Sequence, residues 1–325
     1  MPLWEVMGGG EKGGIVIREG RDLTSKEEQE RLSTGALVFE REVAGERLRY
    51  LRMSGTGPMQ GWASLRIKDK PLLVQRPLQR KVRVLALHGA PGNSNIMKFQ
   101  TAALRKLAGE DFDWAFLDGP CAWAPVPGAT AQNFTERTAM EKSIAKGKAF
   151  VQWYTHPIPD EAAPGDSNGV DDGGKPKEMN FDNVQYLAVE ETIAFLDKHF
   201  AASPTDIIVA FSQAGTMLAL YADALRKAQR PIPWRLSVLV CGSMIDDPRY
   251  ALQEPLDHAA LYIHGGDADP WGRHGERMVP KMYRELEMLE HEDGHGFPAS
   301  HPRAQEIYQR LLQRMYMSVT DLLER

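Results

Sequence analysis

A serine lies where a run of apolar, largely β-branched residues meets a segment of helical character. Residues Ile207–Phe211 predict a buried strand, Ser212 follows directly, and residues 213–229 predict a helix. A serine on such a sharp turn exposes its hydroxyl at the end of a sheet, where it can act as a nucleophile. The structural alternative is a serine that only caps the helix, because serine is favoured at that position.

The positions two residues before and after Ser212 are Ala210 and Ala214, where glycine is usual. Alanine is small enough to let neighbouring backbone segments approach, but it is unfavourable wherever a positive φ is required. Whether either alanine adopts a positive φ is therefore the first question for the structure.

An acid that could orient a histidine follows a later predicted strand, Ala260–Ile263. This strand opens into a glycine-rich turn with Asp267 and Asp269, and an acid at the carboxyl end of a strand can fix the tautomer of a catalytic histidine. We predict Asp269 in that role, because Gly-x-x-Asp is the spacing typical of the α/β-hydrolase fold. Asp267 is expected to satisfy backbone groups of the turn.

The predicted general base is His295, which lies between two glycines after the acid. The order serine, aspartate, histidine is that of α/β-hydrolases. His291 and His301 are the alternatives. His291 and His295 also match His-Glu-x-x-His, but that zinc motif needs a continuous helix, which the glycines and Pro298 oppose. We therefore predict no metal, and a zinc hydrolase is the least favoured alternative.

A second buried strand, Val82–Leu87, ends in His88-Gly89-Ala90-Pro91. In α/β-hydrolases the loop after this strand supplies one backbone N–H of the oxyanion hole. We predict the N–H of Ala90 as this donor, since proline has none, and the N–H of Gln213 as the second donor. His88 is expected to buttress the loop.

The substrate pocket is expected to involve residues 119–135 and a loop at 155–180. Its predicted lining residues are His88, Trp123, Phe134 and Phe297. Aromatic side chains suit an apolar acyl group, but they suit a protein core equally well. The sequence therefore leaves the acyl-chain length open, and also the choice between ester and thioester.

The elements that must position these residues alternate between strands and helices from residue 82 onward. Further strands are predicted at 114–117, 236–240 and 260–263, and helices at 96–108, 182–200, 275–287 and 301–323. This alternation predicts an α/β fold with a mostly parallel central sheet flanked by helices. The loop at 155–180, rich in proline and glycine, is expected to be a flexible lid or a surface insertion.

Residues 1–75 predict a separate small all-β domain. Short alternating runs at 14–18, 36–40 and 47–51, separated by glycine-rich or charged turns, are typical of a small barrel or sandwich. A turn that leads into a strand around Trp62 resembles an SH3-like barrel. Residues 76–81 predict a linker, and residues 82–325 predict the α/β-hydrolase domain.

Several blocks together resemble the FSH serine hydrolases, which include ovarian-cancer-associated hydrolases and fungal esterases and thioesterases. The matching blocks are Val84–Gly89, Phe116–Pro120, Gln152–Tyr154, Phe211–Gln213, Gly266 with Asp269, and Gly294-His295 with Pro298. The resemblance covers roughly residues 81–315 and leaves out residues 1–80. It implies hydrolysis of esters or thioesters through an acyl-enzyme on Ser212, with no metal or organic cofactor. The alternative is a catalytically weak pseudo-hydrolase that acts as a binding protein.

Composition agrees with an ordinary globular enzyme. The chain has 325 residues, 42% hydrophobic and 26% charged, with a net charge of -5. This charge does not favour nucleic acid as a partner, and two distant cysteines form no disulfide framework. The N-terminus lacks a signal-peptide pattern and no apolar run is long enough to span a membrane. We expect a cytoplasmic protein with a small-molecule acyl substrate, and a protein partner of the N-terminal module stays open.

Overall fold

The computed structural model describes residues 3–127, 135–157 and 184–323. The chain divides into two compact units. One comprises Met1–Lys81, Leu107–Asp111 and Leu312–Arg325, and the other comprises Val82–Lys106 and Phe112–Leu311. The predicted linker at 76–81 and the domain limits that it implies remain predictions.

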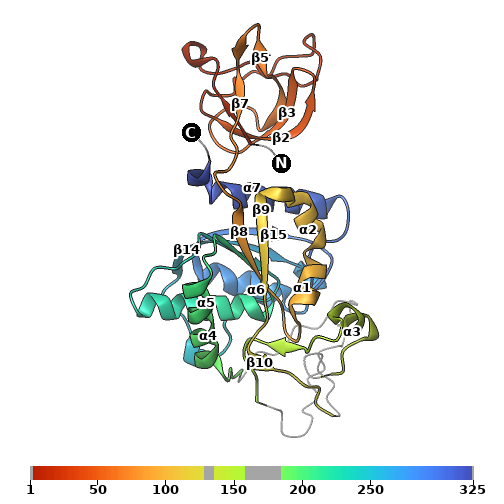
Figure 1. Ribbon diagram of the computed structural model, residues 1–325, viewed down its shortest axis with the longest axis vertical. Coiled ribbons are helices and arrows are strands. Elements are labelled where there is room, and N and C mark those ends of the chain that lie inside the picture. The colour runs from red at the N-terminus through yellow and green to blue at the C-terminus, as the bar shows by residue number, and fades with distance from the viewer. Residues whose placement is uncertain (1–2, 128–134, 158–183, 324–325) are drawn as a thin grey trace. The chain divides into compact units, whose positions relative to one another are not determined.

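The larger unit contains a six-stranded sheet in the order β15-β14-β13-β12-β8-β9, and every pairing in it is parallel (Figure 1). The strands are β8 (Val82–Leu87), β9 (Phe112–Leu117), β12 (Ile207–Phe211), β13 (Leu236–Val240), β14 (Leu256–His264) and β15 (Tyr283–Glu290). All residues of β12 and β13 are buried, as their apolar sequences predict for central strands of a parallel sheet. The predicted α/β class with a parallel central sheet is confirmed.

Helices flank this sheet (Figure 1). They are α1 (Ser94–Gln100), α2 (Ala102–Ala108), α3 (Ala139–Ala145), α4 (Val189–Ala202), α5 (Gln213–Lys227), α6 (Gly272–Met278) and α7 (Arg303–Met317). Local sequence explains where two of them begin. Asn93 accepts hydrogen bonds from the N–H groups of Asn95 and Ile96 at the start of α1, and Thr138 forms a capping box with Glu141 at the start of α3.

The prediction of a helix at 275–287 is wrong in its second half. Helix α6 ends at Met278, a 3-10 turn with Pro280 follows, and Tyr283–Glu290 form the edge strand β15. Proline removes a backbone donor and so stops the helix. The glutamate, leucine and methionine residues of β15 favour helices when isolated, but pairing with β14 decides the structure here.

The other expected helices differ from the structure mainly at their ends. The helix expected at 96–108 is the pair α1 and α2, which meet at Thr101. The helix expected at 182–200 begins at Val189, and the one expected at 301–323 ends at Met317. These shifts leave the strand ends that carry the candidate residues where the sequence places them.

The N-terminal part of the smaller unit contains a five-stranded antiparallel sheet in the order β4-β3-β2-β1-β7. Its strands are β1 (Leu3–Val6), β2 (Leu37–Ala44), β3 (Arg47–Arg52), β4 (Gln60–Ser64) and β7 (Leu73–Gln75), and β5 (Arg66–Ile67) pairs with β6 (Lys70–Pro71). The run at 14–18 contributes only isolated bridges. A core that includes Val6, Ile17, Leu48 and Tyr50 belongs to this part of the chain alone. The small β module thus has its own core, and its SH3-like character remains a prediction.

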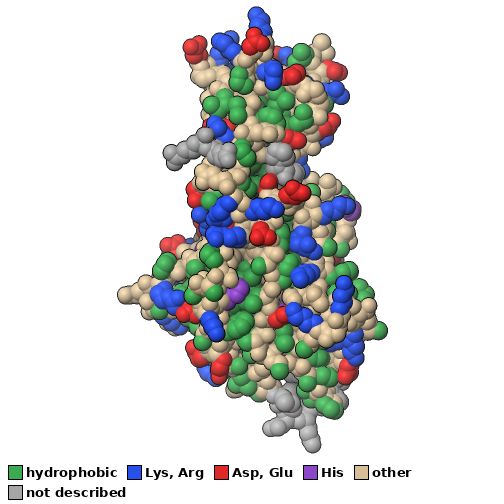
Figure 2. All heavy atoms as spheres, in the orientation of Figure 1, with side chains coloured by type: hydrophobic (Ala, Val, Ile, Leu, Met, Phe, Trp, Pro, Cys, Tyr) green, Lys and Arg blue, Asp and Glu red, His purple; other side chains and the backbone are tan. Residues whose placement is uncertain are grey.

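The surface carries both signs of charge. Lys and Arg side chains are interspersed with Asp and Glu side chains on the face drawn in Figure 2. None of the helices in the described part of the chain combines the length and the apolar composition that a membrane crossing requires. The predicted lid at 155–180 falls mostly outside the described residues, and its first residue, Thr155, forms an isolated bridge with Leu187.

Candidate active site

Ser212 occupies the turn between strand β12 and helix α5. Its φ of 52° and ψ of -121° lie in a region that L-residues rarely adopt. Ala210 and Ala214 are fully buried, and neither is among the residues with positive φ. The strain of the turn therefore falls on the serine itself, and both alanines adopt ordinary backbone conformations.

A third small residue is required one position further along α5. A Cβ atom added to Gly215 would lie 1.9 Å from the Oγ of Ser243, which is closer than any real contact. The sequence pattern centred on Ser212 therefore has its essential glycine at the third position after the serine.

In the structure, hydrogen bonds link Ser212 to His295 and His295 to Asp269. The Nε2 atom of His295 lies 2.9 Å from the Oγ of Ser212. Its Nδ1 atom lies 3.0 and 3.1 Å from the two carboxylate oxygens of Asp269. A carboxylate only accepts, so Nδ1 carries a proton and Nε2 of the neutral ring presents its lone pair to the serine hydroxyl.

The competing residues lie elsewhere. Asp267 is half exposed and forms an ion pair with Arg273. His291 is buried, and its Nδ1 accepts a hydrogen bond from the N–H of Asp293. His301 is exposed. None of these three side chains is positioned to act on Ser212 through the contacts that the structure shows.

Asp269 is buried and held from several directions. The N–H of Trp271 donates to its Oδ1 at 3.0 Å, and the buried thiol of Cys241 also contacts the carboxylate. Burial alone would raise the pKa of Asp269, but hydrogen bonds and charge from His295, with those from Trp271 and Cys241, lower it below its usual value. The carboxylate is thus ionised at neutral pH. No sequence motif indicated Cys241.

The segment around His291 and His295 is not helical. The structural condition for a zinc-protease motif is therefore not met. Among the described residues, one group of three potential metal donors is close together, and it consists of Cys241, Asp269 and His295. In the structure these three side chains contact one another or nearby backbone carbonyls.

The predicted oxyanion donors line the same cavity as Ser212. Neither Ala90 N–H nor Gln213 N–H donates a hydrogen bond within the described residues. The side chain of Gln213 joins helix α5 to the segment after β11 (Val151–Gln152): its Oε1 accepts from Trp153 N–H at 2.7 Å and its Nε2 donates to the Tyr154 carbonyl at 3.0 Å. This pairing fixes the residue whose N–H is the second predicted donor.

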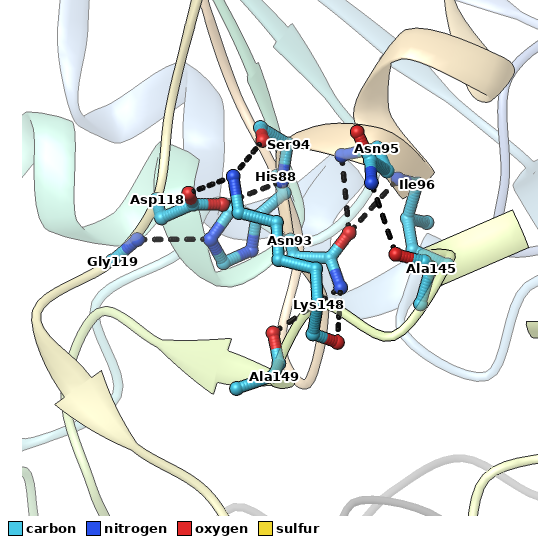
Figure 3. A network of polar contacts seen from close by, with 10 residues as sticks. All are labelled: His88, Asn93, Ser94, Asn95, Ile96, Asp118, Gly119, Ala145, Lys148 and Ala149. Carbon is cyan, nitrogen blue, oxygen red and sulfur yellow. Dashed lines mark hydrogen bonds and ion pairs between the residues drawn. The ribbon is translucent and has the colours of Figure 1, made fainter. Parts of the chain in front are cut away.

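The loop after β8 is held on the side of β9 by His88 (Figure 3). The Nε2 of His88 accepts from Gly119 N–H at 2.9 Å, so Nδ1 carries the proton and donates to the Gly89 carbonyl at 2.7 Å. The Trp153 indole donates to the His88 carbonyl. With no exposed surface and both ring nitrogens bonded, His88 buttresses the loop, as expected.

Beyond the loop, a polar network ties the start of α1 to two other segments (Figure 3). Asp118 accepts from Ser94 N–H at 2.6 Å, and the ammonium of Lys148 bonds both Asp118 and the Ser94 hydroxyl. Asn93 donates to the carbonyls of Lys148 and Ala149. These contacts fix the end of the loop that carries Ala90.

His88 should make stability depend on pH. Burial lowers its pKa to about 4, whereas a histidine in the unfolded chain titrates near 6.5. Between these values only the unfolded chain binds the proton, so stability falls as pH decreases, by about 1.4 kcal/mol per pH unit. Urea unfolding at pH 6.5 and 5 should show wild type losing about 2 kcal/mol more than His88→Gln.

The matched control for this prediction is His301→Gln, because His301 is exposed. It should lose as much stability as wild type over the same pH interval. Equal losses in wild type and His88→Gln would show that His88 does not remain neutral in the folded protein.

The cavity at Ser212 has a volume of about 300 Å³. Of the predicted lining residues, His88, Trp123 and Phe297 are not among those that line it, and Phe134 lies outside the described residues. Phe297 packs against Phe211, and Trp123 against Phe150. The lining instead includes Tyr154, His156, Tyr186, Asp246 and Trp271. Sequence reasoning missed these residues because the chain brings them together from four separate segments.

Comparison with known sequences identifies a matching family and relatives that are named as esterases. The sequence model of the family described as serine hydrolase (FSH1) matches residues 78–307. Esterase GA18864 of Drosophila pseudoobscura pseudoobscura is 22% identical, over 72% of this chain and 71% of its own. Esterase OVCA2 of Danio rerio is 24% identical, over 72% of this chain and 97% of its own.

Solved structures with a similar chain course include Arabidopsis thaliana SOBER1 and a monoacylglycerol lipase of Paleococcus ferrophilus. SOBER1 is 14% identical, with a TM-score of 0.40, over 72% of this chain and 99% of its own. The lipase is 11% identical, with a TM-score of 0.44, over 75% of this chain and 98% of its own.

Proposed function

Because the chain belongs to the serine hydrolase (FSH1) family, we propose that it cleaves carboxylic esters or thioesters through an acyl-enzyme formed on Ser212. The observation that carries this proposal is the continuous set of hydrogen bonds from Ser212 through His295 to Asp269. Esterase names among the relatives support the reaction class. The choice between ester and thioester is part of the proposal.

In the first half of the reaction the Oγ of Ser212 attacks the carbonyl carbon while Nε2 of His295 accepts the serine proton. The carbonyl oxygen becomes an oxyanion that accepts hydrogen bonds from Ala90 N–H and Gln213 N–H. The imidazolium then donates its proton to the leaving alcohol or thiol as the bond to the carbonyl carbon breaks. The acyl group remains on Ser212.

In the second half, water attacks the acyl-enzyme and His295 accepts its proton. The same oxyanion forms again and collapses, and the proton returns to Ser212 as the free acid leaves. Throughout, the ionised carboxylate of Asp269 holds Nδ1 protonated and stabilises the imidazolium.

A fluorophosphonate probe tests the proposal on the intact chain. The probe should modify the folded protein at a single residue, and peptide mass spectrometry should identify it as Ser212, because only a serine beside a general base is sufficiently nucleophilic. Protein unfolded in urea should not react. Absence of labelling in folded wild-type protein would contradict the enzyme proposal and favour the pseudo-hydrolase alternative.

A further inference from the structure

The wall of the catalytic cavity contains a series of hydroxyl groups away from the triad. Tyr154, Tyr186 and Thr216 all line the cavity, and both tyrosines are almost fully buried. The rings of Tyr154 and Tyr186 pack against each other, with their centroids 4.3 Å apart. A carbonyl can only accept and a backbone N–H can only donate, so the hydrogen bonds of the Thr216 and Tyr186 hydroxyls each have a defined direction.

One end of the series is a backbone carbonyl. The Thr216 hydroxyl lies 2.8 Å from the carbonyl oxygen of Met244, which can only accept, so the threonine proton points there. At the other end, Tyr186 Oη accepts from the backbone N–H of Asp246 at 2.8 Å. The Thr216 proton is therefore engaged, and the Tyr186 oxygen, which accepts one hydrogen bond, has a second lone pair with which to accept another.

Two further groups on the same wall are also acceptors. The Nδ1 of His156 donates to the Gln185 carbonyl at 2.9 Å, so Nε2 of the neutral ring carries a lone pair. Burial lowers the pKa of His156 and keeps the ring neutral at pH 7. One carboxylate oxygen of Asp246 accepts from His274 Nε2, and a carboxylate can accept several more hydrogen bonds.

The fixed charges that line the cavity also favour a substrate group that donates hydrogen bonds. The guanidinium of Arg137 forms an ion pair with Glu141, so these two lining residues neutralise each other. Asp246 is the remaining carboxylate among the described lining residues. The Asp246 carboxylate would repel an anionic group on the substrate, and the described lining has no uncompensated cation to bind such a group. A neutral hydrogen-bond donor or a cation on the substrate would be favoured instead.

We propose that the cavity selects small esters whose acyl or alcohol portion carries a hydrogen-bond donor, a hydroxyl or a protonated amine, and that Asp246 with the Tyr186 oxygen receives this donor. The proposal rests on the proposed hydrolytic function of Ser212. It predicts discrimination against purely aliphatic and against carboxylate-bearing esters of the same size. A site built to bind a substrate donor loses affinity for an analogue that leaves its polar groups unpaired.

Matched esters test this selectivity directly. The acyl series consists of ethyl esters of 3-methylbutanoate, 3-hydroxybutanoate and 3-aminobutanoate, with ethyl hydrogen malonate as the anionic member. The same substituents on the alcohol portion of acetate esters make the second series. In at least one series, kcat/KM for the hydroxy or amino ester should exceed that of the methyl isostere by about tenfold or more, the amount expected for one well-placed hydrogen bond.

Variants connect the selectivity to the wall. In Asp246→Asn the ratio of kcat/KM for the amino ester to that for the methyl ester should fall by about tenfold, because the fixed negative charge is lost. Asp113→Asn, on the exposed side of β9, is the matched control and should keep both the ratio and the basal rate. Circular dichroism verifies that each variant is folded, and the wild-type ratios test the proposal independently of any variant.

Two results would overturn the proposal while leaving the proposed function intact. One is hydrolysis of the methyl isosteres or the malonate ester as fast as the donor-bearing esters in both series. The other is an unchanged amino-to-methyl ratio in folded Asp246→Asn. Failure of the fluorophosphonate probe to label Ser212, together with no hydrolysis of any ester, would overturn both proposals and is readily distinguished from these outcomes.

Discussion

Replacing Ser212 by alanine is expected to lower kcat/KM for ester hydrolysis by at least about 10^4-fold and to abolish fluorophosphonate labelling. The substitution removes the atom that forms the acyl-enzyme, while the cavity and the backbone donors remain. Alanine is also smaller than serine, so the buried surroundings accept it without a clash. Initial rates with a p-nitrophenyl ester of short chain length, measured beside wild type, give the comparison.

Ser203→Ala is the control for this variant. Ser203 is exposed at the end of helix α4 in the same compact unit, so its loss should change kcat/KM less than twofold. Retention of more than about one per cent of activity in pure Ser212→Ala protein would mean that another group acts as the nucleophile.

Asp269→Asn is expected to lower kcat by about 10^4-fold with little change in KM. An asparagine amide can donate to Nδ1 of His295, which would place the ring proton on Nε2, facing the serine. The imidazole could then no longer accept the proton from Ser212, although its position would hardly change. Slow fluorophosphonate labelling should persist in this variant, unlike in Ser212→Ala, because the serine is still present.

Asp267→Asn provides a matched comparison, two residues away in the same turn. Asp267 is half exposed and paired with Arg273, so its replacement should leave kcat within about twofold of wild type. The reverse result, a large loss in Asp267→Asn and a small one in Asp269→Asn, would reassign the acid.

The parallel sheet and the positions of Ser212, Asp269 and His295 could be predicted from the sequence because each signal is local. A buried strand followed at once by a turn is visible within about ten residues, and parallel strands bring their carboxyl ends to one edge of the sheet. The order of the three residues along the chain then limited the choice. The structure places Asp269, rather than Asp267, against His295.

The cavity wall could not be predicted because it has no local signal. Tyr154, Tyr186 and Asp246 come from loops far apart in the sequence, and only the folded chain brings them to one cavity. Cys241 contacts Asp269 for the same reason. Strand β15 was missed because an edge strand built from helix-favouring residues is specified by its neighbour β14 rather than by its own composition.

Gln213 contributes its backbone and its side chain to two different parts of the site. Its main-chain N–H is the second proposed oxyanion donor, while its side-chain amide bonds the segment that carries Tyr154. A substitution of Gln213 therefore affects two properties at once. A change meant to reshape the wall at Tyr154 would also alter turnover. Libraries that aim at new substrates should keep Gln213 fixed and vary the opposite wall.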